Sequence, residues 1–282
     1  MLSLEEELMI KKLAYVPEHT VSLMKIVSGG EPFFQNGFLY FEGPHWVILV
    51  GYPLSGEFCE DRIVRMVSHF QEKRNFDYIW VIAPHIPEDL RKDSVAFKKD
   101  YYYTLDLHSF NPPKRLLRQV EKAMGEVSVR VSKVYTSEHR FLSKRFVEEK
   151  EMDPFVKALY ESMGTYLSFS NSALIIDAYD SEKRLVAFYV IETEAEEFLT
   201  YVVGCRRTDN APPFVSDVIF VRMIELAAEL KKRYVHLGLG VNEGIRRFKE
   251  KWGGIPKIPY EFAELTKKRS FLNIMETITN IL

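Results

Sequence analysis

The side chains best suited to chemistry lie between residues 192 and 254 of the sequence. Four glutamates crowd into one turn: Glu192, Glu194, Glu196 and Glu197. A carboxylate can accept a proton from a reacting group, and the consecutive Arg206 and Arg207 can hold an anion. Lys249 lies one turn into a predicted helix and can neutralise negative charge. Each group also has a simpler explanation: a solvated acidic turn for the glutamates, a solvated loop for the arginines and a surface position for the lysine. The secondary structure around these residues therefore determines whether they can act together.

Composition and motifs exclude several classes of protein. The chain has 282 residues, 46% hydrophobic content and a net charge of -2, which predicts one or two globular domains without overall attraction to nucleic acid. The seven histidines lack helical metal spacing and the two cysteines are far apart, so we expect no metal site. P-loop and Ser-His-Asp patterns are absent. With no long apolar run and no leader, we expect a cytoplasmic protein without a membrane span.

Both halves of the chain predict strands, then a helix, then a buried strand. In the first half these are a β-hairpin within Phe38–Pro53, a helix around Ile63–Phe70 and a strand at Tyr78–Ala83. The second half predicts a meander, a helix and a strand ending in glycines: Ala173–Tyr179, Leu185–Glu192, Phe198–Cys205, Phe220–Leu230 and Tyr234–Gly240. Asn242 caps a further helix that ends at Trp252.

The repeated order indicates a duplicated unit. The sequence Val-Arg-Met lies at the same place in both predicted helices, at Val64–Met66 and Val221–Met223, about 157 residues apart. A helix followed by a strand is common, so the short match also fits two unrelated units. We predict two domains, residues 1–135 and 136–282, and we assign a basic helix and a strand in residues 111–134 to their connection.

The order of elements is that of the GNAT acyltransferase fold, and local sequences sharpen the likeness. Leu237–Ile245 and the stretch FKEKWGG at Phe248–Gly254 resemble the matching part of tandem GNAT proteins related to the Fem aminoacyltransferases. Tyr103–Leu107, followed by two prolines and a basic helix, is similar to that family's interdomain segment. The resemblance covers Phe38–Gly254. It implies an α/β fold of the α+β type: two GNAT-like acyl-CoA N-acyltransferase domains in tandem, with mixed, mostly antiparallel sheets flanked by helices.

For function, the resemblance implies that an acyl or aminoacyl group passes from an activated donor to the amine of a small molecule or peptide. Transfer would occur where two neighbouring strands separate, in the second domain, while the first is mainly architectural or acceptor-binding. Glu192 is the candidate proton acceptor, Tyr201 could protonate a leaving thiolate, and Lys249 could neutralise phosphate or oxyanion charge. A buried core tyrosine is the alternative for Tyr201.

The resemblance also implies where the donor would bind. Its phosphates would meet the start of the helix near Val218, with Arg206 and Arg207 adding charge. Gly240 ends the strand whose end would face the acyl group and Asn242 follows it, although capping alone explains Asn242. The loop after Arg206 lacks the glycine-rich phosphate pattern of ordinary acetyl-CoA-using GNAT enzymes.

Two donors and a second class of function stay open. Acyl-CoA is the preferred donor, because Arg206 and Arg207 form a compact charged group. Aminoacyl-tRNA is the alternative, because the Lys249 segment most resembles the Fem branch; it would need an extended basic track. One predicted helix offers a basic face, which a solvated surface also explains: Lys114, Arg115, Arg118 and Lys122. The competing hypothesis is a non-catalytic small-ligand or protein-binding protein on the same scaffold.

Overall fold

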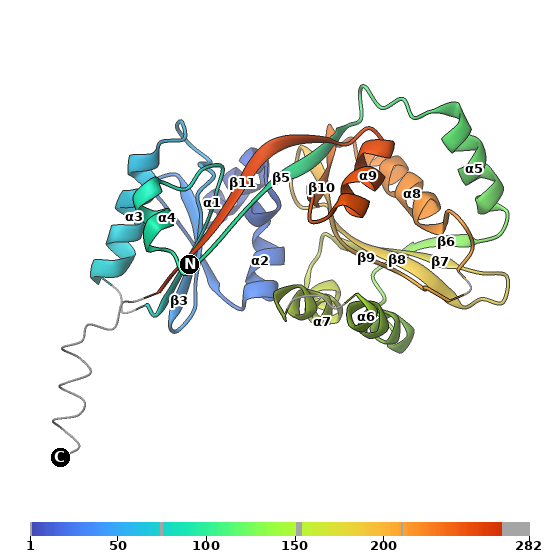
Figure 1. The fold of residues 1–282 in the computed structure, drawn as a ribbon, viewed down its shortest axis with the longest axis horizontal. Coiled ribbons are helices and arrows are strands. Elements are labelled where there is room, and N and C mark those ends of the chain that lie inside the picture. Colours follow the sequence, from blue (N-terminus) through green and yellow to red (C-terminus); the bar gives the residue numbers. More distant parts are fainter. Residues whose placement is uncertain (1, 74–75, 151–153, 210, 267–282) are drawn as a thin grey trace, which may run out of the picture. The chain divides into compact units, whose positions relative to one another are not determined.

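The computed structural model describes residues 2–73, 76–150, 154–209 and 211–266, which form two compact units (Figure 1). The large unit comprises Met1–Pro32 and Asp100–Pro259, and the small unit comprises Phe33–Lys99 and Tyr260–Leu282. Residues 267–282, the end of the predicted second domain, lie outside the described residues. The units are defined by packing, so the predicted boundary between two copies after residue 135 stays a prediction.

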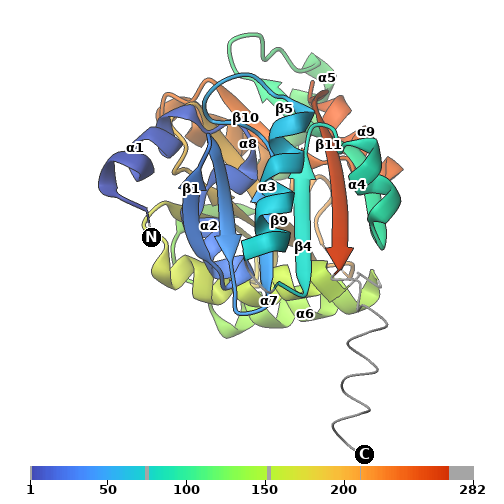
Figure 2. The same ribbon diagram turned by 90° about the vertical axis from the view of Figure 1, so that its left-hand side faces the viewer.

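The small unit has a sheet with the order β1-β2-β3-β4-β11 and one helix across a face (Figure 2). Its strands are β1 Glu31–Gln35, β2 Phe38–Glu42, β3 Trp46–Val50, β4 Tyr78–Ala83 and the last part of β11 Ile255–Thr266. Helix α3 (Glu60–Lys73) joins β3 to β4, and α4 (Glu88–Asp93) follows. The apolar stripe Ile63, Met66, Val67 and Phe70 packs on the sheet.

The large unit has a six-strand arrangement with the order β5-β10-β9-β8-β7-β6. Its strands are β5 Ala96–Asp106, from Asp100 onward, and β6 Ser128–Ser132, β7 Ala173–Tyr179, β8 Leu185–Glu192, β9 Phe198–Arg206 and β10 Tyr234–Leu239. Every residue of β8 is buried, as expected for a strand covered on both faces.

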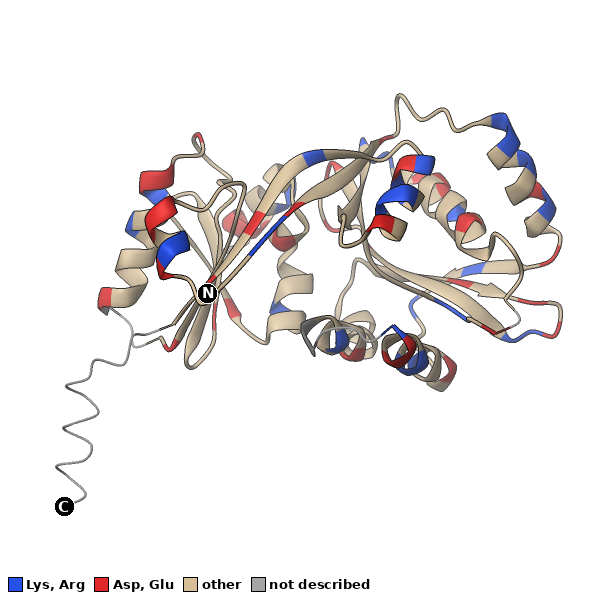
Figure 3. Ribbon diagram, in the orientation of Figure 1, with Lys and Arg blue, Asp and Glu red and all other residues tan. Residues whose placement is uncertain are grey.

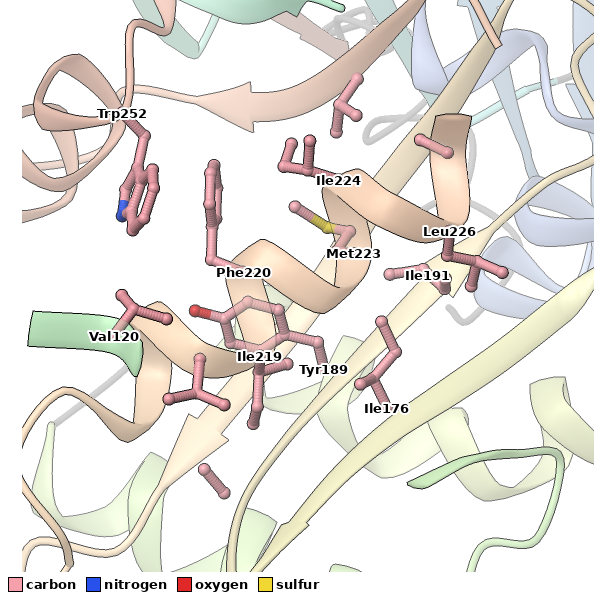
Figure 4. Close-up of a cluster of buried hydrophobic side chains, with 14 of the residues drawn as sticks. Val120, Ile176, Tyr189, Ile191, Ile219, Phe220, Met223, Ile224, Leu226 and Trp252 are labelled. Atoms are coloured by element: carbon pink, nitrogen blue, oxygen red, sulfur yellow. The ribbon is translucent and has the colours of Figure 1, made fainter. Parts of the chain in front are cut away.

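Helices cover both faces of this sheet (Figure 1). On one face α5 (Lys114–Met124) and α8 (Val215–Glu229) pack into the main core, which includes Phe220 and Trp252 (Figure 4). On the other face α6 (Ser137–Glu149) and α7 (Pro154–Phe169) pack with α2 (Val21–Ser28). The remaining helices are α1 Leu4–Leu13, the 3₁₀ turn η1 Pro17–His19 and α9 Glu243–Lys251.

The two predicted helices occupy equivalent places in their sheets. α3 joins the parallel strands β3 and β4, and α8 joins the parallel strands β9 and β10. In each unit the second of these strands has an antiparallel neighbour from the opposite half of the sequence: β11 beside β4, and β5 beside β10. The two halves therefore exchange a strand, a feature that local sequence patterns do not predict.

Residues 111–134 do more than connect the halves. The predicted basic helix is α5, and the predicted strand is β6, which pairs with β7 at the edge of the large unit's sheet. Within the described ranges, no helix combines the length and apolarity needed to cross a bilayer. The same residues hold no group of three or more His, Cys, Asp or Glu side chains suited to a metal ion.

Candidate functional site

Two neighbouring parallel strands of the large unit separate partway along their length. β9 and β10 pair at three successive positions: Phe198 with Tyr234, Leu199 with Val235, and Thr200 with His236. β9 then continues to Arg206 and β10 to Leu239, and no further pair joins these described segments. Beyond this point the backbone N–H and C=O groups of β9 and β10 are not paired with each other as they would be in a continuous sheet. A separation of two neighbouring strands is the arrangement expected at the transfer site.

Irregularities in both strands account for this separation. The pairing of β10 with β5 shifts register between His236 and Leu239, and Gly238 there has a φ of +74°, which side-chain-bearing residues rarely adopt. The pairing of β9 with β8 shifts register between Tyr201 and Val203. A bulge bends its strand, so bulges just beyond the last parallel pair turn the two strand ends apart.

The equivalent strands of the small unit stay paired. β3 and β4 are in register from Trp46–Tyr78 to Val50–Ile82, and the Gly51 N–H continues the series by donating to the Ile82 carbonyl at 2.6 Å. A Cβ atom on Gly51 would lie 2.8 Å from Ile63 Cδ1, so helix and strand pack tightly at this point. The candidate site therefore belongs to the large unit.

A row of buried polar residues crosses the sheet at the last paired position. Glu192 on β8 lies opposite Thr200, which lies opposite His236, which in turn lies opposite Thr104 on β5. Opposite residues in adjacent strands point to the same face. All four side chains are at most 5% exposed. This polar row therefore lies on one face of the sheet, beside the strand separation.

Glu192 is held in a hydrogen-bond network at one end of the row. Its Oε1 accepts from the backbone N–H groups of Thr193 and Glu194, both at 2.7 Å. Its Oε2 accepts from the Tyr166 hydroxyl and, at 3.3 Å, from the Ser170 hydroxyl. Burial, with a smaller effect from Glu194, raises the pKa of Glu192 to about 7. The solvated-turn explanation is wrong for this glutamate, because its side chain is buried.

Lys249 reaches the end of β10 from helix α9. Its side chain is only 5% exposed, and Nζ donates to the Leu239 carbonyl at 2.5 Å and lies 5.5 Å from the centre of the Tyr103 ring. Burial lowers the pKa of Lys249 to about 7, with a small opposing effect from Asp100. The surface-lysine explanation is therefore wrong, and this side chain changes charge near neutral pH.

His236 lies in the candidate site, at the last pair of β9 and β10, and its place was not predicted from the sequence. Its ring is fully buried, and Nδ1 accepts from the Gly238 N–H at 3.3 Å. Burial, with a smaller effect from Lys249, lowers the pKa of His236 to about 3. The hydrogen bond to Nδ1 assigns the proton of the neutral ring to Nε2. The signal in the sequence was a single polar residue inside the apolar strand Tyr234–Leu239.

Tyr201 lies at the separation but packs into the main core. Its ring meets the Tyr189 ring edge-on, with centroids 4.9 Å apart. A Cβ atom on Gly204 would lie 2.5 Å from its hydroxyl oxygen. Burial raises the pKa of Tyr201 above its ordinary value. A raised pKa makes the hydroxyl a weaker acid, and its predicted role toward a leaving thiolate stays a prediction.

The two arginines after β9 differ in their surroundings. Arg206 is exposed, whereas Arg207 Nε lies 3.2 Å from Asp209 Oδ1. Arg145 bonds to the second oxygen of Asp209 at 3.2 Å, and these two guanidinium groups hold the pKa of Asp209 near 2. The charge of Arg207 is thus partly balanced within the protein, which leaves Arg206 as the more available cation.

Helix α8 begins at Val215, before the predicted start near Val218. Its N-cap residue, Phe214, has a φ of +62° and a side chain that cannot accept a hydrogen bond. Asp217 in the first turn accepts from Trp252 Nε1 at 2.8 Å and from Lys251 Nζ at 2.5 Å. A carboxylate therefore already interacts with this helix start, and a phosphate there would depend on nearby cations.

Gly240 and Asn242 build the entry to α9. The Asn242 side chain accepts from the Ile245 N–H at 3.0 Å, which confirms the predicted cap. A Cβ atom on Gly240 would lie 2.7 Å from Asp100 Oδ1, so a larger residue would displace that carboxylate. The same carboxylate accepts from the Val241 N–H at 2.8 Å. Any part that Gly240 and Asn242 play in donor binding stays a prediction.

Loss of the Asn242 cap is expected to destabilise the protein modestly. Asn242→Ala removes the acceptor of the Ile245 N–H and should lower the free energy of unfolding by about 1 kcal/mol. Urea denaturation measures this difference. Asn111→Ala, at an exposed loop position, is the matched control and should match the unmodified protein. Equal stability of all three proteins would show that the cap contributes nothing.

Comparisons with known proteins identify the fold. No protein-family model matches the chain, and no curated protein matches it. The structure of L-PGS from Bacillus licheniformis is 19% identical with a TM-score of 0.57, over 92% of this chain and 91% of that one. FemX is 12% identical with a TM-score of 0.59, over 98% of each chain. A tandem GNAT protein from the clavulanic acid biosynthesis pathway is 11% identical with a TM-score of 0.55, over 83% and 79%.

These likenesses extend over both units rather than one. The predicted α/β fold class is confirmed: the chain has a GNAT-like fold, similar to that of a tandem GNAT protein and to the structures of FemX and L-PGS.

Proposed function

We propose that the chain is an N-acyltransferase that moves an acyl or aminoacyl group from an activated donor to an amine. The observation that carries this proposal is the separation of β9 and β10 beyond Thr200 and His236. Lys249 and the buried polar row both adjoin that point. Structures of the same fold include a tandem GNAT protein and FemX.

The chemistry assigns a task to each group. Attack of the amine on the donor carbonyl forms the new C–N bond and places negative charge on the carbonyl oxygen. Lys249 in its ammonium form, at the end of β10, would stabilise that charge. Glu192, whose pKa of about 7 suits a proton acceptor, would receive the amine proton through the polar row. Collapse of the intermediate breaks the bond to the leaving group, which takes up a proton.

We propose an acyl-CoA thioester as the donor and a small-molecule or peptide amine as the acceptor. The exposed Arg206 and the start of α8 offer a compact place for a few phosphates. Aminoacyl-tRNA is the second candidate, favoured by the basic face of α5 (Figure 3). The four basic side chains of that face are exposed: Lys114, Arg115, Arg118 and Lys122.

Ligand-dependent stabilisation tests the donor. Acetyl-CoA that binds only the folded protein should raise the free energy of unfolding by about 2.7 kcal/mol at 100 times its dissociation constant. Thermal shift with acetyl-CoA measures this binding, and release of free thiol on addition of a panel of primary amines measures transfer. Arg206→Gln should weaken donor binding, whereas the exposed Arg233→Gln is the control.

Results other than acetyl-CoA binding with thiol release would favour a different function. Transfer-RNA binding that weakens steeply with salt, without acetyl-CoA binding, would replace the thioester by aminoacyl-tRNA as donor. Binding of acetyl-CoA without thiol release for any amine would favour the non-catalytic binding protein. An absence of binding by either donor would overturn the proposed transferase.

A further inference from the structure

The N-terminal segment Pro17–Ser22 packs on the face of the sheet that carries the polar row. Ser22 Oγ donates to Glu194 Oε2 at 2.7 Å and lies 3.5 Å from Glu192 Oε2. Four residues earlier, Glu18 forms a side-chain hydrogen bond with Tyr102 of β5. Tyr102 lies two residues from Thr104 along β5 and therefore shares the face of the polar row. This short segment thus contacts Glu192 at one end of the row and Tyr102, which lies beside the other end.

Three buried polar atoms lie in this region without a hydrogen-bond partner in the described parts of the chain. They are Glu18 Oε2, Thr20 Oγ1 and His236 Nε2. Leaving a buried polar atom unpartnered is unfavourable, so the native state is expected to supply a partner. Clusters of such atoms are typical of places where a protein receives a polar ligand or water.

Tyr102 brings two of these atoms into one neighbourhood. Its hydroxyl bonds to the Glu18 carboxyl, and its ring meets the His236 ring edge-on, with centroids 4.9 Å apart. Phe198 lies on β9, and its ring centroid is 5.7 Å from that of His236. The neighbourhood therefore combines aromatic faces with one free carboxyl oxygen and one free ring N–H.

These groups have the chemistry of an amine-binding site. Burial raises the pKa of the Glu18 carboxyl, but an ammonium group beside it would favour the ionised form, which accepts a hydrogen bond and balances the positive charge. Aromatic faces attract cations and pack against an alkyl chain. The neutral His236 ring adds a donor without adding a positive charge. His236 is also the last residue of β10 that pairs with β9, so a ligand held here lies next to the strand separation.

We propose that Glu18, Tyr102 and His236 form the subsite for the acceptor, and that the acceptor presents a primary alkylamine. This inference rests on the proposed transferase function, because it names the substrate class for the second half of that reaction. It also assigns a function to Pro17–Ser22, a segment that lies outside the region of family resemblance.

A binding experiment with n-butylammonium chloride tests the subsite without requiring turnover. Protein labelled with ¹⁵N-histidine is titrated, and the His236 ring signals, assigned with His236→Gln, are followed by NMR. Saturable shifts at His236 are expected, with at least tenfold weaker binding in Glu18→Gln. Glu5→Gln, on the exposed side of α1, should bind like the unmodified protein, and n-butanol should not bind. Tyr102→Phe, which keeps the ring, should also weaken binding and serves if Glu18→Gln does not fold.

The outcomes separate this inference from the proposed function. Absence of saturable binding, or equal binding by Glu18→Gln and Tyr102→Phe, would overturn the amine subsite even if acetyl-CoA releases thiol. Conversely, the protein could bind the amine in a way that depends on Glu18 and yet bind neither donor. That result would support the subsite and overturn the proposed transferase function.

Discussion

Replacement of Lys249 by methionine is expected to reduce acyl transfer by about 10²–10³-fold while the protein stays folded, the effect seen when a donor to a developing oxyanion is removed. Methionine preserves most of the buried stem, so the main loss is the charge near the Leu239 carbonyl. The measurement is kcat/KM for thiol release from acetyl-CoA with the best amine of the panel. If Lys249→Met turns over at the rate of the unmodified protein, Lys249 takes no part in acyl transfer.

The pH dependence identifies the form of Lys249 that acts. Burial lowers its pKa to about 7, so the ammonium form predominates below that pH and is lost as the pH rises through it. If the ammonium group stabilises the oxyanion, kcat/KM should decline above pH 7. Lys249→Arg keeps its charge at all accessible pH values and should move this decline to higher pH. Lys257→Met, an exposed lysine of β11, is the control and should leave the profile unchanged.

Local patterns in the sequence predict most elements of the two units. The strand Tyr78–Ala83 has the bounds that were expected, and Asn242 caps the helix that it was expected to cap. Such features depend on neighbours within a few residues, which periodicity and capping rules describe well. The same rules placed the two Val-Arg-Met helices, which lie at equivalent positions between parallel strands.

Strand exchange between the halves could not be predicted from those rules. β5 and β11 each continue from one unit into the other, and β11 pairs with β4, which lies far away in the sequence. Alternating apolar residues fix which face of a strand is buried, but they do not identify its partner. The segment Tyr103–Leu107 resembles an interdomain segment in sequence, yet most of it belongs to β5.

The candidate site was predicted only in part, for a related reason. Glu192 and Lys249 were singled out by residue type and by resemblance, but their burial and shifted pKa values arise from packing between distant segments. His236 and Glu18 carried no motif at all. They become candidates only once β10, β5 and the N-terminal turn lie together.

Glu192→Gln is expected to stabilise the protein at pH 8 and to have little effect near pH 4. Burial raises the pKa of Glu192 in the folded state to about 7 from an ordinary value of 4.5. The folded state therefore holds the proton more tightly than the unfolded state does. Below about pH 4.5 both states are protonated, and the stability associated with the neutral carboxyl is fully present. That stability is lost as the pH rises from 4.5 through 7.

The size of the effect follows from the shift. A difference of this size between the two pKa values corresponds to roughly 3 kcal/mol, and Glu192 is buried enough for the conversion to apply. Glutamine keeps an acceptor for the Thr193 and Glu194 N–H groups and has no proton to lose. The difference in unfolding free energy between Glu192→Gln and the unmodified protein should therefore grow by roughly 3 kcal/mol between pH 4 and pH 8.

Urea denaturation of both proteins across this pH range measures the difference, because the contributions of all other titrating groups largely cancel in the comparison. Glu196→Gln, an exposed neighbour in the same turn, is the matched control, and its difference should stay nearly constant with pH. A constant difference for Glu192→Gln as well would mean that Glu192 ionises in the folded protein as it does in the unfolded chain. Glu192 would then lack the near-neutral pKa on which its role as proton acceptor depends.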